Sequence, residues 1–277
     1  MRFAQALVTE CLQLFWPAHC ASCDAVLASD DAIFCGLCAQ AVNPIAGACG
    51  VCALPRFSLD WSRQCAGCAR SHFAFTQAMA AFEYGESLAA AIIRMKHGDR
   101  PELARRLARL LRDPLRRVAG LAPTATRPLG GGLRIDATLP PLDMVIPVPL
   151  HPRKLRRRGF NQALELARGA LEASPPQPVG ASDSSGSTPS LRPPRLERNL
   201  LRRVRETREL GRSGPNERRA EVAGAFAIAQ PGRVLGKRIL LVDDVMTTGA
   251  TLNACATTLL EAGATEVRVL ALARAVA

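Results

Sequence analysis

Eight cysteines near the N-terminus have the spacing of metal ligands. They form four Cys-x-x-Cys pairs in a chain of 277 residues. Such a turn presents two thiolates to one tetrahedral ion, and two turns complete a structural zinc site. Disulfides would not persist in a reducing compartment, and a redox motif would not recur four times. We therefore predict zinc ligation by Cys20, Cys23, Cys35, Cys38, Cys49, Cys52, Cys65 and Cys68.

Two arrangements of the zinc sites fit this spacing. Sequential pairing places one ion on the first four cysteines and a second ion on the last four, whereas interleaved pairing mixes the two sets. In either case four thiolates fill the coordination sphere and leave no position for a catalytic water. We expect two structural zinc ions.

A second candidate site follows a short apolar run at residues 239–243. The carboxylates of Asp243 and Asp244 stand at its end, and small or hydroxylated residues come next. Such residues let the backbone wrap a phosphate and donate N–H groups to it, and a following helix would point its positive end into the same loop. An ordinary strand–turn–helix is the alternative interpretation. The phosphate-binding candidates are Thr247, Thr248, Gly249, Ala250 and Thr251.

Basic residues follow another buried strand, expected at residues 143–148. The segment after it, PLHPRKLRRRGFNQ, carries five Lys and Arg side chains, among them Arg153 and Arg158. Pyrophosphate binding, nucleic-acid backbone binding and a solvated surface all fit this run. Its place at a strand's carboxyl end, where open α/β sheets bind ligands, favours pyrophosphate. Lys96 ends an expected helix and either reaches an anionic ligand or only offsets the helix dipole.

The hydrophobic pattern predicts the elements that position these residues. An amphipathic helix is expected at 3–16, ended by Pro17, and the body begins at Phe73. Strands and helices then alternate, which is typical of a parallel α/β sheet. We expect strands at 78–84, 143–148, 222–228, 239–243 and 266–273, helices at 87–96, 101–117 and from 252 to Gly263, and a loop at 120–142.

Composition limits the function classes. Lys and Arg number 36 against 24 Asp and Glu, and the net charge of +12 suits phosphate-rich partners. No apolar run of about 18 residues exists, so we expect no transmembrane helix. Polar residues interrupt the apolar N-terminal segment, so we expect no cleaved signal peptide and a cytoplasmic protein.

Two longer patterns resemble known families. The stretch VDDVMTTGAT is similar to the phosphoribosyl-pyrophosphate (PRPP) motif of type I phosphoribosyltransferases, although purine-salvage members have aspartate where this chain has Thr247. The stretches PVPLHPRKLRRRGFNQ and LLRRVRETRELGRSGPNERRAEVAGAF resemble the ComF family, also called competence protein F or GntX-like. Glu209 departs from the glutamine expected in the second pattern.

The resemblance implies an architecture. It implies a type I phosphoribosyltransferase-like parallel sheet flanked by helices, joined to an N-terminal cysteine-rich double zinc ribbon. We expect the helix and ribbon in residues 1–72 and the phosphoribosyltransferase-like domain in residues 73–277. A Pro-, Ser- and Gly-rich insertion near 172–195 should be disordered.

The resemblance also implies roles for individual residues. Asp243 and Asp244 would hold the ribose hydroxyls of PRPP and assist Mg²⁺, and residues 247–251 would hold its 5′-phosphate. Pyrophosphate would be neutralised by Arg153, Arg158 and Lys96. An arginine-rich hood at residues 198–219, with Arg205 and Arg208, would close over the site.

Two functions are compatible with these features. The first is a Mg²⁺-dependent phosphoribosyltransferase, a glycosyltransferase that moves a phosphoribosyl group to an unidentified acceptor and releases pyrophosphate. The alternative is a non-catalytic competence factor that binds single-stranded DNA or DNA-uptake proteins. The chain has few aromatic residues for base stacking, which argues against the alternative.

Overall fold

A computed structural model describes residues 17–56, 65–69, 71–97, 100–120, 140–172, 193–207 and 214–275. The helix expected at 3–16, most of the loop expected at 120–142, most of the insertion near 172–195, and Arg208 lie outside the described residues. No helix in the described part is both long and apolar enough to cross a membrane.

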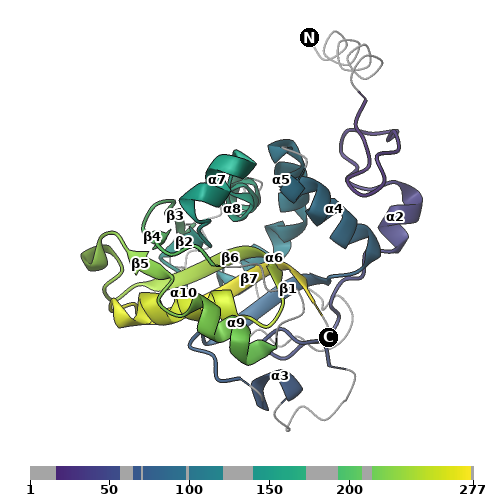
Figure 1. Cartoon of the computed structure of the whole chain (residues 1–277). Coiled ribbons are helices and arrows are strands. Elements are labelled where there is room, and N and C mark those ends of the chain that lie inside the picture. The colour runs from purple at the N-terminus through teal and green to yellow at the C-terminus, as the bar shows by residue number, and fades with distance from the viewer. Residues whose placement is uncertain are drawn as a thin grey trace, which may run out of the picture.

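The centre of the molecule is a five-stranded parallel sheet, as expected (Figure 1). Its strand order is β1-β7-β6-β2-β3, and each neighbouring pair is parallel. Arg195 was expected to end the disordered insertion but lies in an edge strand. The strands are β1 (Gln77–Glu83), β2 (Met144–Pro147), β3 (Arg195–Leu196), β6 (Arg238–Met246) and β7 (Glu266–Arg274).

Strand β6 shows how the sequence builds this sheet. Successive side chains of a strand point to opposite faces. Ile239 and Leu241 therefore join one hydrophobic cluster, whereas Leu240 and Val242 join another. Both faces are covered, which is why the strand reads as a continuous apolar run.

Different helices cover the two faces. One face packs on α4 (Glu86–His97), α5 (Pro101–Ala108), α6 (Arg112–Val118) and α8 (Gln162–Glu172). The other packs on α10 (Ala250–Glu261) and on cysteines of the N-terminal part.

The prediction of one continuous helix at 101–117 was wrong. The structure has α5, a 3-10 turn η1 (Arg109–Leu111) and α6 in its place. Pro114 accounts for the break, because it has no N–H to donate to Leu110 and its ring would clash there in a continuous helix.

A smaller layer packs beside α10. Strand β4 (Leu201–Arg203) pairs antiparallel with β5 (Phe226–Ile228), and α9 (Pro215–Val222) lies between them in the sequence. The strand expected at 222–228 begins later than predicted. Val222 ends α9 and Gly224 turns the chain with φ of 65°.

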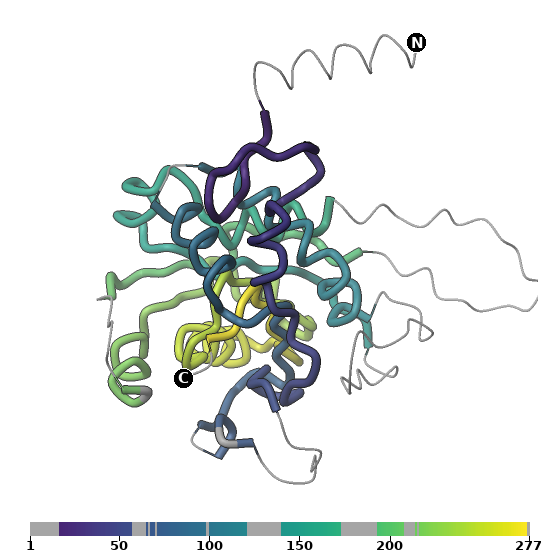
Figure 2. Tube along the Cα trace, turned by 90° about the vertical axis from the view of Figure 1, so that its right-hand side faces the viewer, coloured from purple at the N-terminus to yellow at the C-terminus, as the bar shows by residue number. Residues whose placement is uncertain are grey.

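The cysteine-rich segment covers the β1 edge of the sheet (Figure 2). Ile45 N–H donates to the Ala81 carbonyl at 3.1 Å, and Glu83 N–H donates to the Asn43 carbonyl at 2.9 Å. Covering an edge strand blocks its pairing with other chains. The segment also contains the short helices α2 (Gly36–Gln40) and α3 (Ala66–Ala69).

Candidate active site and metal centres

The eight cysteines gather in two groups of four. Within each group the four Sγ atoms lie within 4.8 Å of one another. Distances of 3.6 Å between Cys49 and Cys68 and 3.8 Å between Cys23 and Cys35 suit a tetrahedral Zn²⁺ site, whose Zn–S bonds of about 2.3 Å separate sulfurs by about 3.8 Å. The grouping is the sequential one: the first cysteine group is Cys20, Cys23, Cys35 and Cys38, and the second cysteine group is Cys49, Cys52, Cys65 and Cys68.

The two groups differ in their surroundings. All four cysteines of the second group are buried and share a hydrophobic cluster with the sheet, whereas Cys23 is exposed. Without metal these thiols share protons, because the hydrogen bond between Cys52 and Cys49 lowers the pKa of Cys49 and raises that of Cys52. Since four sulfurs would complete the coordination sphere, both groups suit structural zinc.

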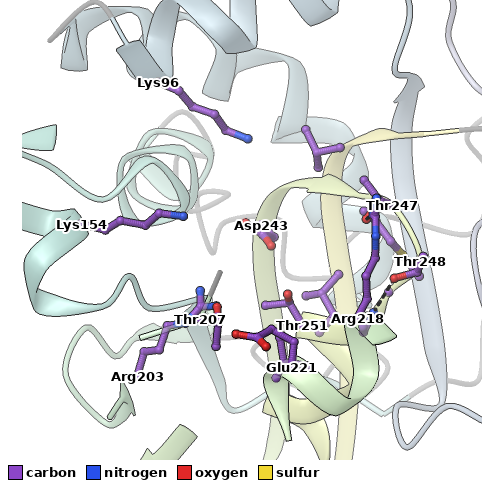
Figure 3. Close-up of a pocket in the computed structure, with 16 residues that line it drawn as sticks. Lys96, Lys154, Arg203, Thr207, Arg218, Glu221, Asp243, Thr247, Thr248 and Thr251 are labelled. Atoms are coloured by element: carbon purple, nitrogen blue, oxygen red, sulfur yellow. Dashed lines mark hydrogen bonds between the residues drawn. The ribbon is translucent and has the colours of Figure 1, made fainter. Parts of the chain in front are cut away.

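A cavity of about 350 Å³ opens at the carboxyl end of β6 (Figure 3). Its wall includes all five candidates of the segment 247–251, which we call the threonine loop. Gly249 makes the turn possible, because its φ is 78° and a Cβ there would lie 2.9 Å from Met246 Cε and 3.0 Å from Phe73 Cε1.

The two aspartates face different surroundings. Strand β6 does not end at residue 243 as expected but continues to Met246. The side chains of Asp243 and Asp244 therefore point to opposite faces of the sheet. Asp243 lines the cavity. Asp244 is buried, and its Oδ2 lies 2.8 Å from Lys96 Nζ on α4. Lys96 itself lines the cavity, so of the predicted acidic pair only Asp243 reaches the wall.

Burial shifts the proton equilibria of these groups. Desolvation, with the neighbouring Asp244 charge, raises the pKa of Asp243 to about 8, although Lys96 opposes the change. Desolvation acts to lower the pKa of Lys96, but the Asp244 carboxylate more than compensates and raises it. Lys96 therefore stays a cation, whereas Asp243 with such a pKa keeps its proton at neutral pH and loses it only as the pH passes about 8.

Of the other predicted cations, Arg153 and Arg158 do not line this cavity. Arg153 forms an ion pair with Glu206 at 2.8 Å, and its side chain is 72% exposed. Arg158 donates a 2.7 Å hydrogen bond to Gln162 Oε1.

The reason is that the basic segment folds as a helix, α7 (Pro152–Arg158). Pro152 at its first position and Gly159 after its last are helix signals that the sequence already carried. A helix spreads its side chains around an axis. Lys154 therefore lines the main cavity, while Arg153 and Arg157 line an adjoining one of about 330 Å³.

The predicted hood contributes different residues from those expected. Arg205 donates to the backbone carbonyls of Glu221 and Ala223, at 2.6 and 2.8 Å, and is not in the cavity wall. Arg218 donates to Thr247 Oγ1 at 3.1 Å. Sequence reasoning recognised the arginine-rich stretch but did not single out its residues that line the cavity, which are Arg203, Thr207 and Arg218. It also missed Glu221, just beyond the stretch.

Comparison with known proteins relates the chain to a phosphoribosyl transferase domain and to two DNA utilization proteins. Residues 204–276, which hold α9, β6, the threonine loop and β7, match the phosphoribosyl transferase domain family. DNA utilization protein YhgH of Salmonella typhimurium is 28% identical over 261 residues, 93% of this chain and 97% of that protein. Its namesake from Escherichia coli strain K12 is 27% identical over the same shares.

A third relative carries the name expected from the motifs. Competence protein F of Haemophilus influenzae is 29% identical over 220 residues, 78% of this chain and 80% of that protein. The two four-cysteine groups and the parallel sheet agree with the expected architecture. The chain is therefore similar over most of its length to DNA utilization protein YhgH and to competence protein F, and its residues 204–276 match the phosphoribosyl transferase domain.

Proposed function

We propose that this protein is a Mg²⁺-dependent phosphoribosyltransferase that binds PRPP in the 350 Å³ cavity. One observation carries the proposal: the threonine loop, the Asp243 carboxylate and four cationic side chains share one cavity at the carboxyl end of a parallel sheet. Ligands of open α/β sheets bind at such an edge.

The threonine loop suits the 5′-phosphate. Its last two residues, Ala250 and Thr251, already begin α10, two residues earlier than the helix start expected at 252. The first backbone N–H groups of this twelve-residue helix have no partner within the helix. Those donors and the positive end of the helix dipole favour a phosphate, and the hydroxyls of Thr247, Thr248 and Thr251 add further donors.

Asp243 suits the ribose and the metal. Its carboxylate can accept hydrogen bonds from the ribose hydroxyls and support Mg²⁺, a cation that would neutralise phosphate oxygens and retain most of its water. Asp244 acts differently from our expectation, because its ion pair with Lys96 holds that ammonium at the wall of the cavity.

The cations suit the leaving group. When the bond between C1 and the pyrophosphate oxygen breaks, the sugar becomes oxocarbenium-like and negative charge collects on pyrophosphate. Fixed positive charges stabilise that charge without reorganisation. The cavity offers Lys96, Lys154, Arg203 and Arg218, and Arg153 lies beside it in the adjoining cavity.

Calorimetric titration with PRPP and Mg²⁺ tests the proposal. We expect saturable binding that requires Mg²⁺ and that falls at least tenfold in Asp243→Asn. Asp31→Asn is the matched control, because that carboxylate is 98% exposed in the cysteine-rich segment. An affinity that is unchanged in Asp243→Asn, or no binding to the wild type, would exclude the proposed site.

A second function is favoured by α7 and by the relatives' names. This helix carries five basic residues and buries none of them, and two of the relatives are named DNA utilization proteins. Single-stranded DNA could follow such a surface through its phosphates. Binding of this kind weakens steeply with salt and is indifferent to Asp243→Asn, whereas PRPP binding depends on that residue.

A further inference from the structure

Arg274, the last residue of β7, connects the second cysteine group to the threonine loop. Its side chain is buried, and its Nε donates to the Cys52 carbonyl at 3.1 Å. Its Nη1 donates to the carbonyls of Met246 at 3.1 Å and Ala275 at 2.7 Å, and also to that of Thr247. One guanidinium thus contacts a candidate metal ligand and the first residue of the threonine loop.

The chemistry of arginine makes this contact stiff. A guanidinium is planar and carries five N–H donors in fixed directions, so a movement of the Cys52 carbonyl must be followed by Arg274 or break a hydrogen bond. The contact also offsets charge. Four thiolates around one Zn²⁺ leave a net negative charge, and Arg274 places a buried cation next to it.

A second set of contacts joins the same two regions. Ala74 N–H, shortly after the second cysteine group, donates to Asn253 Oδ1 on α10 at 2.6 Å. Phe73 packs so closely under Gly249 that a Cβ there would meet its ring at 3.0 Å. The floor of the threonine loop is therefore built by the chain that leaves the second cysteine group.

The first cysteine group has no comparable link among the described residues. Its contacts run to the other side of the molecule, where Arg94 donates to the Ser22 carbonyl at 3.1 Å and Arg106 to the His19 carbonyl at 2.6 Å. Both arginines lie on α4 and α5, which pack on the opposite face of the sheet from α10.

We propose that Arg274 is a positioning residue through which metal binding at the second cysteine group sets the geometry of the threonine loop. The structural link stands on the contacts above. Its consequence for PRPP affinity rests on the proposed function. Metal at the first cysteine group leaves the loop unaffected.

Hydrogen–deuterium exchange of the amides in residues 247–251 tests the link in the full-length, zinc-loaded protein. We expect exchange at least tenfold faster in Arg274→Met and in Cys65→Ser, with no further increase in the double variant, because both changes break one connection. Cys35→Ser, in the first cysteine group, should leave these amides unchanged.

Arg268→Met is the matched arginine control. Arg268 is buried on the same strand, but at the other end, where it donates to the carbonyls of Val118 and Pro140 at 3.0 and 2.9 Å. If amide exchange in residues 247–251 were accelerated equally in Arg268→Met, Arg274 would have only a general stabilising role and the proposal would be overturned. If Arg274→Met does not fold, Arg274→Lys, which keeps the charge but not the planar set of donors, should show the same acceleration.

Titration with PRPP and Mg²⁺ then separates the two proposals. If the wild type binds, affinity should fall at least tenfold in Arg274→Lys and Cys65→Ser but not in Cys35→Ser. If the wild type does not bind, the proposed function fails while the exchange result still decides the link. Unchanged exchange in both Arg274 variants, with zinc retained, would overturn the link whatever PRPP does.

Discussion

Lys96 and Asp244 form a buried ion pair in which Nζ lies 2.8 Å from Oδ2. The carboxylate is 5% exposed and faces α4, while the ammonium is 25% exposed and reaches the cavity. Lys96 can therefore pair with two anions at once, the Asp244 carboxylate and a phosphate group of a ligand in the cavity. Adjacent aspartates on β6 thus have separate tasks, with Asp243 at the cavity and Asp244 holding a cation in place.

Removing the cation should destabilise the fold. In Lys96→Met the Asp244 carboxylate would remain buried without its partner, which typically costs about 3–5 kcal/mol of unfolding free energy. Urea denaturation of the wild type and the variant measures this loss. The double variant Lys96→Met/Asp244→Asn should recover most of it, because no charge is then left uncompensated. A double variant as unstable as Lys96→Met would assign the loss to packing.

Asp243 should make both stability and ligand binding depend on pH. Its pKa is about 8 in the folded protein and near 3.8 in the unfolded chain, so ionisation disfavours the folded state as pH rises from 4 to 8. Taken in full, that difference would amount to about 5 kcal/mol at pH 8. Because Asp243 lines a cavity that opens to solvent, screening reduces it, and Asp243→Asn should be more stable than the wild type by about 1–2 kcal/mol at pH 8 and by nearly nothing at pH 4.

The same ionisation has the opposite effect on function. The deprotonated carboxylate is the form that supports Mg²⁺ and accepts from ribose hydroxyls, so affinity for PRPP should rise as pH passes through about 8. Thermal unfolding and calorimetry from pH 5 to pH 9 follow the two trends. A stability difference that is flat over this range would show that Asp243 stays ionised in the folded protein.

The sequence was sufficient to locate the cavity but not to orient its carboxylates. Residue types alone predicted that 247–251 forms a loop after a buried strand, because only small and hydroxylated residues suit a close turn. They could not show that β6 continues to Met246. Three further strand residues decide which aspartate faces α10 and which faces α4, and that extension depends on pairing with β7.

The basic segments show a similar limit. Charge predicted that the stretches after β2 and around residues 198–219 approach an anion, and both supply the cavity wall. Which arginine points inward depends on the local backbone. Arg153 and Lys154 are neighbours in the sequence, yet α7 turns only Lys154 into the main cavity. Arg205 is diverted to the end of α9, where two carbonyls need a donor.

Arg218 should matter for ligand binding and little for stability. It lies on the exposed helix α9 and donates to Thr247 Oγ1 at 3.1 Å. In Arg218→Ala the unfolding free energy should change by about 0.5 kcal/mol or less, whereas PRPP affinity should fall about tenfold through loss of a charge-assisted contact. Arg202→Ala, an exposed arginine on β4 outside the cavity wall, is the control. Equal affinities for the two variants would contradict this role.

Removal of metal should occur in two steps. We expect two zinc ions per chain, one for each cysteine group. The first group includes the exposed Cys23, so a chelator can reach its ion directly, whereas the second group is buried and must open before it releases metal. Zinc release measured with a chromogenic chelator should therefore be biphasic, with the fast phase absent in Cys23→Ser and the slow phase absent in Cys52→Ser.

Because the second group shares a hydrophobic cluster with the sheet, only its loss should lower the melting temperature of the whole domain by several degrees. A single release phase, or an equal fall in melting temperature for both variants, would mean that the two groups are not independent.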